Sequence, residues 1–549
     1  MAKQKEKSPA PSSLTMDLNA PGMTAMHRAG LGGLAATLRR VNITRRDNPN
    51  AIKKEPWNEA FSWNIQPTTL TLNFGEANQA AKFLRWLFEF AFQIRDGLIW
   101  LPGMEGVEKP LAVEVQAQLQ QGMLLTFLQH GQTRTLAGDE QTLSYMCDDK
   151  RIEYKCKPCS CYTHQSSWKD WVNDKGELVL KEYDVQGPVH PGAVVRHQAW
   201  TGKTKISQPL ELILPLYFAI VGTLSISINR GTGVLIVPYV DNLKTFAKNR
   251  SRMTPMTIDN CLIGGVGDAA LQFEVRCRAD EEAETADALG CDVIRFRPMP
   301  WATQQKSRTE TLSIDRLDSQ VVEFYRRILG YFHPHVVTTE KIKKEGRGKN
   351  AVSETITENF WGDSVIRPFI AENLARGRLW FEGFARWLCS NEPASGQQYW
   401  KKIQLERKGR GLYKMVNDKS SWQQQGTPAG AEALVFAVQE ALRRRYGAIA
   451  DECKKSGAAV GNRFGGEYER WRLAFSGAKT AEQFRYALTD MFSRAKNCPP
   501  LREHWKEIID LMVGNWELAR DLALVGLASY AKKEGDPDVE QDAEQNVAE

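Results

Sequence analysis

Glycine residues near the N-terminus have the spacing of a nucleotide-binding loop. The stretch GLGGLA, residues 30–35, matches the pattern G-x-G-x-x-G/A, in which glycines let the backbone approach a pyrophosphate. Such a loop begins at the end of a strand, and an acidic residue closes the next strand about 20 residues later. Here the strand-like LTMDL ends at Leu18, twelve residues before Gly30, and Asp47 lies in the loop-like RRDNPN. The context therefore argues against a cofactor loop.

A helix over about residues 25–40 explains the same stretch better. One face of this helix would carry Leu31, Leu34 and Leu38 and point inward. Gly30 and Gly33 would lie on roughly the opposite, exposed side. Interior glycines cost a helix about 1 kcal/mol each relative to alanine, so we expect a close contact on that side. The partner is either a neighbouring protein helix or the sugar-phosphate chain of a nucleic acid.

Other catalytic patterns are incomplete in this sequence. Residues 202–204 (GKT) resemble the end of a phosphate-binding loop, but His197 stands where that loop needs its first glycine. The sequence contains neither the H-E-x-x-H pattern of zinc enzymes nor the G-x-S-x-G pattern of hydrolases. We therefore expect a binding protein without a catalytic cofactor rather than an enzyme.

A cysteine cluster has part of the spacing of a zinc knuckle. Cys156 and Cys159 are separated by two residues, which lets two thiolates reach one tetrahedral ion. Cys147, Cys161 and His164 supply candidate third and fourth ligands. A structural zinc site within residues 145–170 and free thiols in a loop are the two alternatives.

Lysine and arginine gather in several segments that suit a phosphate backbone, because mobile cations can follow an irregular charged track and release its counterions. Each single run taken alone is better explained as solvated surface. Several runs in a chain whose net charge is only +6 favour a nucleic-acid channel. The candidate residues are Asn19, His27, Arg28, Arg39, Arg40, Arg45 and Arg46 near the glycines, Arg230, Lys244, Lys248, Arg250 and Arg252 at and after a predicted hairpin, Lys341, Lys343, Lys344, Arg347 and Lys349 in the loop-like KIKKEGRGKN, and Arg443, Arg444 and Arg445 near the C-terminus.

The segment over residues 293–314 combines a strand-like start with an aromatic platform, two amides and two cations. Stacking, amide hydrogen bonds and phosphate pairing together suit the recognition of unpaired bases or of a groove edge. A strand end with a buried tryptophan is the structural alternative. The residues concerned are Trp301, Gln304, Gln305, Lys306 and Arg308.

Length and composition describe a multidomain globular protein. The chain has 549 residues, of which 42% are apolar and 25% charged. Its first residues lack the apolar core of a signal peptide, and the longest apolar run, residues 210–228, contains Glu211 and Pro215. We expect no membrane span and a cytoplasmic location, in which the ten cysteines stay reduced or bind metal.

Periodicity divides the chain into two kinds of segment. The first four hundred residues alternate strand-like and helix-like stretches, such as TTLTLNF, EANQAAKFLRWLFEFAFQIR and a hairpin from GTLSISIN to VLIVPYV. From Ala431 onward the pattern is helical, with one apolar face that carries Leu434, Val438, Leu442 and Ile449. We predict an α+β fold with a disordered N-terminus (1–13), a mixed α/β body (14–414, with the zinc-knuckle insertion at 145–170), an α-helical bundle (415–531) and an acidic disordered tail (532–549).

Two segments and the domain order resemble a known family. The segments LNAPGMTAMHRAGLGGLAATLRR and WATQQKSR resemble the large subunit of type I CRISPR interference complexes (Cascade), in the variant first described from myxobacteria and grouped near subtype I-B. The resemblance implies a subunit without nuclease activity that touches the 5′ handle of the crRNA. It also implies recognition of the protospacer-adjacent motif in duplex DNA before the strands separate into an R-loop.

The resemblance also implies partners. These are crRNA, target double-stranded DNA, the backbone, 5′-handle-binding and small subunits of Cascade, and a recruited helicase-nuclease. The helical C-terminus would resemble the small subunits and hold the target or displaced strand. Met415 precedes the predicted bundle, so a separate small subunit could begin there. A general RNA-binding protein outside CRISPR and a nucleotide-cofactor enzyme are the alternatives.

Overall fold

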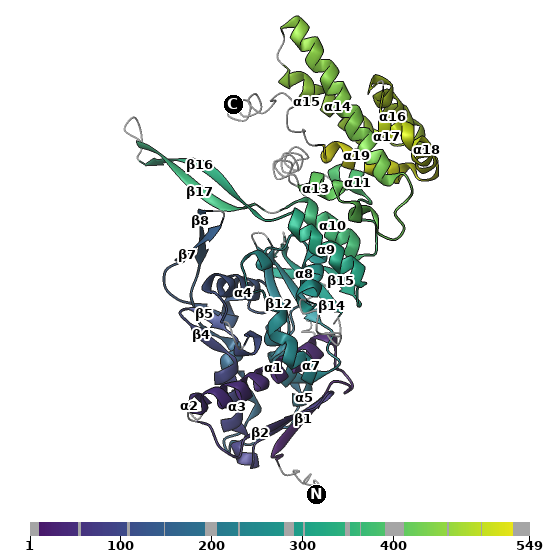
Figure 1. Ribbon diagram of the computed structural model, residues 1–549. Coiled ribbons are helices and arrows are strands. Elements are labelled where there is room, and N and C mark those ends of the chain that lie inside the picture. The colour runs from purple at the N-terminus through teal and green to yellow at the C-terminus, as the bar shows by residue number, and fades with distance from the viewer. Residues whose placement is uncertain are drawn as a thin grey trace. The chain divides into compact units, whose positions relative to one another are not determined.

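Figure 1 shows the computed structural model of the chain, which consists of two compact units. The N-terminal body comprises residues 1–317 and 334–363, and the helical unit comprises residues 318–333 and 364–549. The predicted α+β class is confirmed. The predicted tail at 532–549 and most of the predicted segment 1–13 lie outside the described residues. The structure describes residues 10–52, 56–106, 110–147, 149–192, 206–228, 231–278, 290–299, 302–345, 352–362, 364–389, 411–457, 460–495 and 497–530.

Helix α1 (Ala25–Asp47) lies at the centre of the N-terminal body. It starts where the sequence predicts and is longer than expected at its C-terminal end. Every residue from Ala29 to Leu38 is buried, because the helix contacts α5 (Leu210–Tyr217), α6 (Ala219–Gly222) and α7 (Leu243–Asn249). A helix surrounded in this way belongs to the core of the fold.

The glycines of α1 make backbone-to-backbone contact inside the body. A Cβ atom on Gly30 would lie 2.0 Å from the carbonyl oxygen of Pro215, and one on Gly33 would lie 2.4 Å from that of Phe218. The partner is thus a protein helix, which is the first of the two alternatives given above, and not a nucleic-acid backbone. The prediction that these glycines are exposed is wrong, because α5 and α6 cover them. Their loss would disturb the fold and not only an outer contact.

A three-stranded sheet and several further elements make up the first half of the N-terminal body. Strands β1 (Ser13–Asp17), β3 (Thr69–Asn73) and β2 (Ser62–Ile65) form an antiparallel sheet in that order. The predicted strand TTLTLNF corresponds to β3, and the helical pattern after it forms α3 (Ala80–Ala91). The remaining short elements are α2 (Pro49–Ile52), β4 (Gln93–Arg95), β5 (Leu98–Trp100), α4 (Val113–Leu125), β6 (Arg134–Leu136), β9 (Cys159–Tyr162), β10 (Tyr183–Asp184), β11 (Ser207–Gln208) and α8 (Val266–Cys277).

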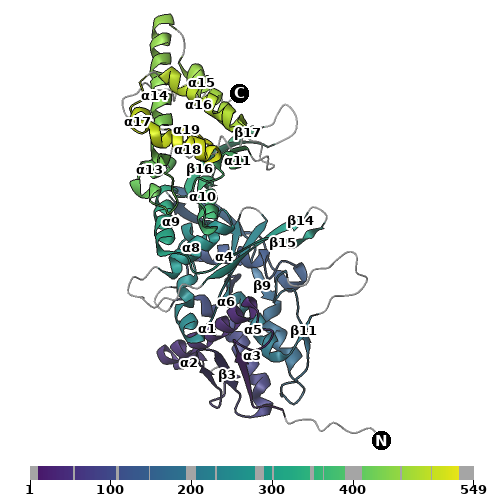
Figure 2. The same ribbon diagram turned by 90° about the vertical axis from the view of Figure 1, so that its right-hand side faces the viewer.

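An antiparallel sheet of four strands forms the second half of the body. Its order is β12 (Leu224–Ile228), β13 (Thr232–Pro238), β14 (Cys291–Met299) and β15 (Ala302–Ile314). The predicted hairpin is confirmed as β12 and β13, and Arg230 at its tip lies outside the described residues. Every residue of β13 is buried, since α1, α4 and α8 pack against the sheet. The sheet therefore holds β14 and β15 on a rigid base (Figure 2).

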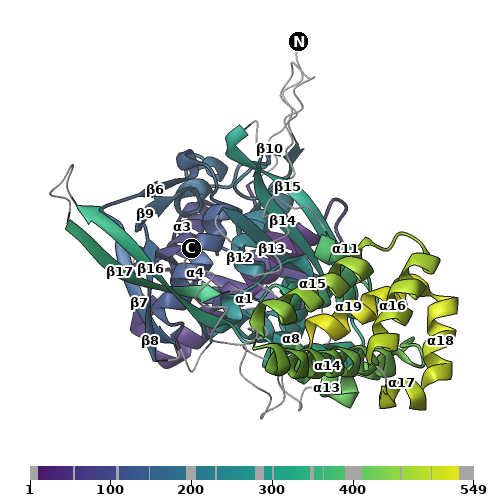
Figure 3. The same cartoon turned by 90° about the horizontal axis from the view of Figure 1, so that it is seen from above.

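Two further hairpins lie side by side in the body (Figure 3). One consists of β7 (Gln141–Cys147) and β8 (Lys150–Cys156), and the other of β16 (His335–Glu345) and β17 (Val352–Gly362). Tyr145 stacks on Trp361 with ring centroids 5.9 Å apart. The Asn359 side chain donates a hydrogen bond to the carbonyl oxygen of Arg151 at 3.0 Å. These contacts attach the longer hairpin to the shorter one.

The helical unit contains the predicted bundle. The longest helix, α14 (Ala431–Ser456), begins after Gly430 and ends at Gly457, and both glycines have positive φ. Its four predicted apolar positions are all buried. The other bundle helices are α15 (Gly461–Gly477), α16 (Ala481–Ala495), α17 (Pro499–Glu503), α18 (Trp505–Gly514) and α19 (Trp516–Ala528).

Segments before the bundle also pack in the helical unit. They are α9 (Ser319–Tyr331), α10 (Ile366–Ala375), α11 (Phe384–Cys389) and α13 (Gly411–Asn417). The Asp521 carboxylate on α19 accepts hydrogen bonds from the backbone N–H groups of Gly383 (2.7 Å) and Ala385 (2.8 Å). The Trp380 ring lies 5.4 Å from that of Trp422, and its indole N–H donates to the Ser421 carbonyl. The compact unit thus includes more of the chain than residues 415–531.

In the part of the chain that the structure describes, no helix is long and apolar enough to cross a bilayer.

Candidate nucleic-acid interface

The β14–β15 hairpin brings four cationic residues to neighbouring positions. Arg297 lies opposite Ser307, and the next positions pair Pro298 with Lys306 and Phe296 with Arg308. Cross-strand neighbours in such a ladder are about 5 Å apart. Residues that pair directly share a face, so Arg295 and Arg297 belong to one face of the hairpin, and Lys306 and Arg308 to the other. The hairpin therefore carries positive charge on both faces, and the four residues are Arg295, Arg297, Lys306 and Arg308.

The sequence predicted half of this cluster. Lys306 and Arg308 were candidates, and Gln304 and Gln305 also lie on β15, whereas Trp301 lies outside the described residues. Arg295 and Arg297 were missed, although their spacing of two in VIRFRP places them on one face of a strand. The Arg295 guanidinium lies 3.7 Å from the Glu310 carboxylate, so part of its charge is already paired.

A second set of cations lies on β16 and not in a loop. The loop interpretation of KIKKEGRGKN is wrong at its start, because Lys341, Lys343 and Lys344 belong to a strand that pairs with β17 along eleven positions. Lys341 lies opposite Ile356, and Lys343 opposite Glu354. Each residue of a strand advances by about 3.3 Å, so Lys341 and Lys343 share one face about 6.6 Å apart, and Lys344 belongs to the opposite face. Arg347 and Lys349 lie outside the described residues.

The cations of α1 and α7 differ in how far they are already engaged. Arg40 donates to the carbonyl oxygen of Gly106 at 3.2 Å, and Lys244 donates to Gln66 at 3.2 Å. Arg45 pairs with Glu59 at 3.6 Å, and Arg46 pairs with Asp47 at 2.9 Å. Asn19 is exposed, and so is Arg252. Three side chains have no partner among the described residues, namely Arg28, Arg39 and Lys248.

His27 is a structural residue in this fold. Only 1% of it is exposed, and its Nδ1 accepts a hydrogen bond from the backbone N–H of Thr24 at 3.3 Å. Its Nε2 then donates to the Gln208 side chain at 2.9 Å. Burial lowers the pKa of His27, so the ring stays neutral. The nucleic-acid assignment of His27 is therefore wrong, because the residue anchors the N-terminus of α1.

Arg250 is also buried and satisfied within the body. Its guanidinium donates to the carbonyl oxygens of Val221 (2.6 Å) and Thr223 (2.7 Å) and to the Thr254 hydroxyl (2.9 Å). Burial lowers its pKa to about 9. With 1% of its surface exposed, Arg250 cannot contact a phosphate. The prediction that Arg250 binds a nucleic acid is wrong, because its guanidinium binds backbone carbonyls at the C-terminal end of α6.

The arginine run of α14 is paired with carboxylates of the helical unit. Arg443 and Arg444 both contact Glu440, each at 2.6 Å. Arg445 contacts Glu467 at 3.2 Å. Binding of a nucleic acid by these residues would thus compete with existing ion pairs.

The predicted zinc ligands do not come together. Cys156 ends β8 and Cys159 begins β9, whereas Cys147 lies at the opposite end of the β7–β8 hairpin, facing Lys150. A strand of seven residues spans about 20 Å, so Cys147 and Cys156 are too far apart to share an ion. Among the described residues, no group of three or more His, Cys, Asp or Glu could hold a metal ion. We therefore assign no zinc site.

His164 lies in an aromatic cluster and not beside the cysteines. Its ring centroid is 5.5 Å from that of Phe92, 5.8 Å from Tyr162 and 5.7 Å from Tyr217. The residue is fully buried, and neither ring nitrogen has a hydrogen-bond partner among the residues that the structure describes. Burial lowers its pKa to about 3, which keeps the ring neutral. As placed, it cannot complete a zinc site with Cys161, which is exposed.

Comparison with known proteins adds an independent finding. Residues 15–217 match the family model described as the DevT N-terminal domain, and residues 419–549 match the DevT C-terminal domain. The chain is similar to "CRISPR-associated protein Cas8a1/Csx13" of Myxococcus xanthus (strain DK1622). The two are 32% identical over 563 residues, which cover 98% of this chain and 92% of the relative. The similarity therefore includes both the N-terminal body and the helical unit.

Proposed function

This chain belongs to the Cas8a1/Csx13 family of CRISPR-associated proteins, and we propose that it is the non-catalytic large subunit of a crRNA-guided type I surveillance complex. In this role it contacts the crRNA 5′ handle, recognises the protospacer-adjacent motif in duplex DNA and supports R-loop formation. The observation that carries the proposal is the 32% identity across 98% of the chain, which agrees with the resemblance of the sequence.

The β14–β15 hairpin supports a contact with duplex DNA. Two of its cations belong to each face of the hairpin, so a hairpin inserted between two phosphate backbones could contact both, and such contacts fix the register of a protein on DNA. Gln304 and Gln305 on the same hairpin carry amides, which can bind adenine edges in the major groove. We assign recognition of the adjacent motif to this hairpin.

The β16–β17 hairpin supports a second phosphate contact. Lys341, Lys343 and Lys344 are spaced along one strand, so they can follow a nucleic-acid backbone. Arg28, Arg39 and Lys248, which have no partner within the described ranges, are candidates for the crRNA handle. In the helical unit, the target or displaced strand would exchange with the carboxylates that now pair with Arg443 and Arg444.

Strand cleavage has no assigned residues in this proposal. The sequence lacks the catalytic patterns considered above, so cutting belongs to a recruited helicase-nuclease. The subunit would act in the cytoplasm, together with the backbone, 5′-handle-binding and small subunits. Guide pairing would then read the remaining target sequence, as in other RNA-guided effectors.

Reconstitution with and without this chain tests the proposal. The complex is assembled with its guide RNA and mixed with target duplexes that carry or lack the adjacent motif. We expect motif-dependent binding, and permanganate reactivity of unpaired thymines, only when the chain is present. Equal binding and opening without the chain would refute the proposal. Binding of RNA by the chain without preference for a CRISPR handle would favour a general RNA-binding protein.

A further inference from the structure

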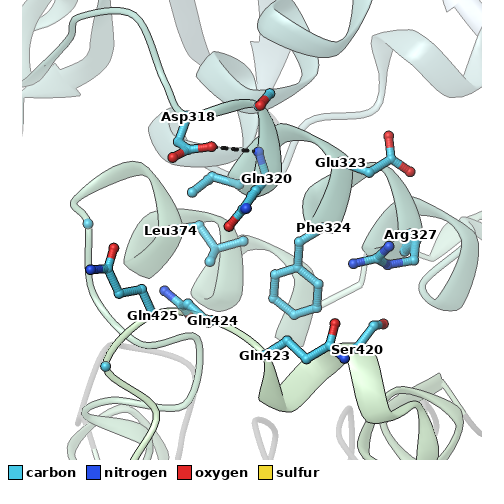
Figure 4. Close-up of a pocket in the computed structure, with 14 residues that line it drawn as sticks. Asp318, Gln320, Glu323, Phe324, Arg327, Leu374, Ser420, Gln423, Gln424 and Gln425 are labelled. Carbon is cyan, nitrogen blue, oxygen red and sulfur yellow. Dashed lines mark hydrogen bonds between the residues drawn. The ribbon is translucent and has the colours of Figure 1, made fainter.

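A polar pocket lies within the helical unit, between α9 and the segment that follows η7 (Lys419–Trp422). Its volume is about 840 Å³, which is within the usual range of ligand pockets. Figure 4 shows Phe324 of α9 near its centre, with Leu374 beside it and a row of glutamines opposite. All lining residues belong to the same compact unit, so the pocket is a feature of that unit alone.

Most side-chain amides that line this pocket have no hydrogen-bond partner in the part of the chain that the structure describes. Gln424 is satisfied, because it accepts from the backbone N–H of Trp380 at 3.1 Å and donates to the Arg378 carbonyl at 2.7 Å. The side chains of Gln320, Gln423 and Gln425 make no hydrogen bond among the described residues. Three amides that each offer donors and an acceptor therefore face one space.

One buried polar atom at the pocket also lacks a hydrogen-bond partner among the described residues. It is Nε of Arg327, which lines the pocket. Buried donors are rarely left unsatisfied in proteins, so such an atom indicates a missing ligand or water. Because Arg327 borders the pocket, a bound molecule can satisfy this donor.

The charges at the pocket leave one cation available. The Asp318 carboxylate accepts from the backbone N–H of Gln320 at 2.7 Å and caps α9. Glu323 is paired with Arg326, which does not line the pocket. Among the described residues, no carboxylate lies within ion-pair distance of Arg327, although its charge helps to lower the pKa of Asp418. The guanidinium carbon of Arg327 lies 5.8 Å from the centre of the Phe324 ring. An anionic group would thus be held next to an aromatic wall.

We propose that this pocket binds one nucleotide of a single-stranded nucleic acid, with the base against Phe324 and the phosphate on Arg327. The amides of Gln320, Gln423 and Gln425 would bind the edge of the base, because amides match its donors and acceptors. A duplex buries its base faces by stacking, so only an unpaired base can enter. This inference rests on the proposed function, since an R-loop supplies unpaired strands.

Photocrosslinking of the full-length chain tests the pocket directly. The probes are single-stranded thymidine and uridine oligonucleotides that carry a thiocarbonyl base. We expect crosslinks in the peptides that contain Phe324 and Gln423. Crosslinking by the thymidine probe assigns the pocket to a DNA strand, and crosslinking by the uridine probe assigns it to RNA. Crosslinks only at other peptides would overturn the proposal.

Matched variants connect the crosslink to affinity. Gln320→Ala combined with Gln423→Ala changes two exposed side chains, and Arg327→Gln removes the unpaired cation. Each should weaken oligonucleotide binding about tenfold. Arg326→Gln removes the same charge one position away, outside the pocket, and should bind like the parent chain. Equal affinity in all variants would refute the site, whereas failure of the proposed function would show instead as guided target binding that does not need the chain.

Discussion

Gly33 of α1 lies so close to Gly222 of α6 that a Cβ atom on Gly33 would be 2.5 Å from the Gly222 nitrogen. Two backbones can approach to this distance only when neither residue carries a side chain there. We predict that Gly33→Ala lowers the free energy of unfolding by about 3 kcal/mol, because the helices must separate. Urea denaturation measures this change.

A glycine in open space is the control for that substitution. Gly447 lies in α14, and an added Cβ would meet no heavy atom within 4 Å. Gly447→Ala should therefore stabilise the protein by up to about 1 kcal/mol through helix propensity. Equal effects of the two substitutions would contradict the close contact.

Arg250→Met should destabilise the N-terminal body by about 3 kcal/mol. The substitution leaves the carbonyl oxygens of Val221 and Thr223 without their buried donor. Thermal unfolding measures the loss, and nucleic-acid affinity per folded molecule should stay unchanged. Lys82→Gln, at an exposed position on α3, is the control. A selective loss of affinity in Arg250→Met would restore the interpretation as a phosphate ligand.

His164 should make the free energy of unfolding depend on pH below 6.5. Its pKa is about 3 in the folded protein against an ordinary value of 6.5, so the unfolded chain binds the extra proton first. Protonation of His164 therefore does not lower the free energy of unfolding above pH 6.5. Below that, it lowers the free energy of unfolding by about 1.4 kcal/mol per pH unit as the pH drops towards 3. His164→Phe should flatten the melting temperature between these limits. His333→Gln, at an exposed position, should keep the parent profile.

The salt dependence of target binding should report the β14–β15 cations. Combined Arg297→Gln, Lys306→Gln and Arg308→Gln substitutions should reduce the slope of log affinity against log salt by about 3, because each lost phosphate contact contributes about 0.9. Electrophoretic shifts of the complex at several salt concentrations measure the slope. Arg85→Gln, which breaks an exposed pair with Glu89 on α3, should leave it unchanged. An unaltered slope in the triple variant would remove the hairpin from the interface.

A fragment that begins at Met415 should be unstable by itself. Met415 is fully buried in α13, and the fragment lacks Trp380, which covers Trp422 in the complete chain. It also lacks the N–H groups that satisfy the Asp521 carboxylate. We expect strong binding of a hydrophobic dye, whereas a fragment from Ser364 should bind little. A compact, dye-free Met415 fragment would support a separate small subunit of that length.

The periodicity of apolar residues predicted the helices of this chain well, but it did not predict which of their side chains the rest of the fold buries. The leucines of α1 and the apolar face of α14 followed from helical periodicity, because that periodicity depends only on neighbouring residues. The burial of Gly30, His27 and Arg250 depends on α5 and α6, which are about 180 residues away from α1. A glycine or an arginine looks the same in a sequence whether solvent or backbone lies beside it.

The candidate site shows the same division. Lys306 and Arg308 stood out as a short basic run, but their neighbours Arg295 and Arg297 join them only through strand pairing. The pocket around Phe324 was not predicted, since its walls come from residues about 50 to 100 positions apart. The cysteine spacing suggested a knuckle, yet strand β8 separates Cys147 from Cys156. The spacing of the cysteines in the sequence does not show that an extended strand holds Cys147 and Cys156 apart.

The β16–β17 hairpin begins and ends at a single rung, where His335 faces Gly362. The chain therefore leaves the helical unit after α9 and returns to it before α10, and the outgoing and returning segments are adjacent at this pair of residues. An insertion of this form can be lengthened, shortened or replaced in evolution while α9 and α10 keep their packing. Charge on the hairpin is thereby free to diversify as targets change, without a cost to the stability of the helical unit.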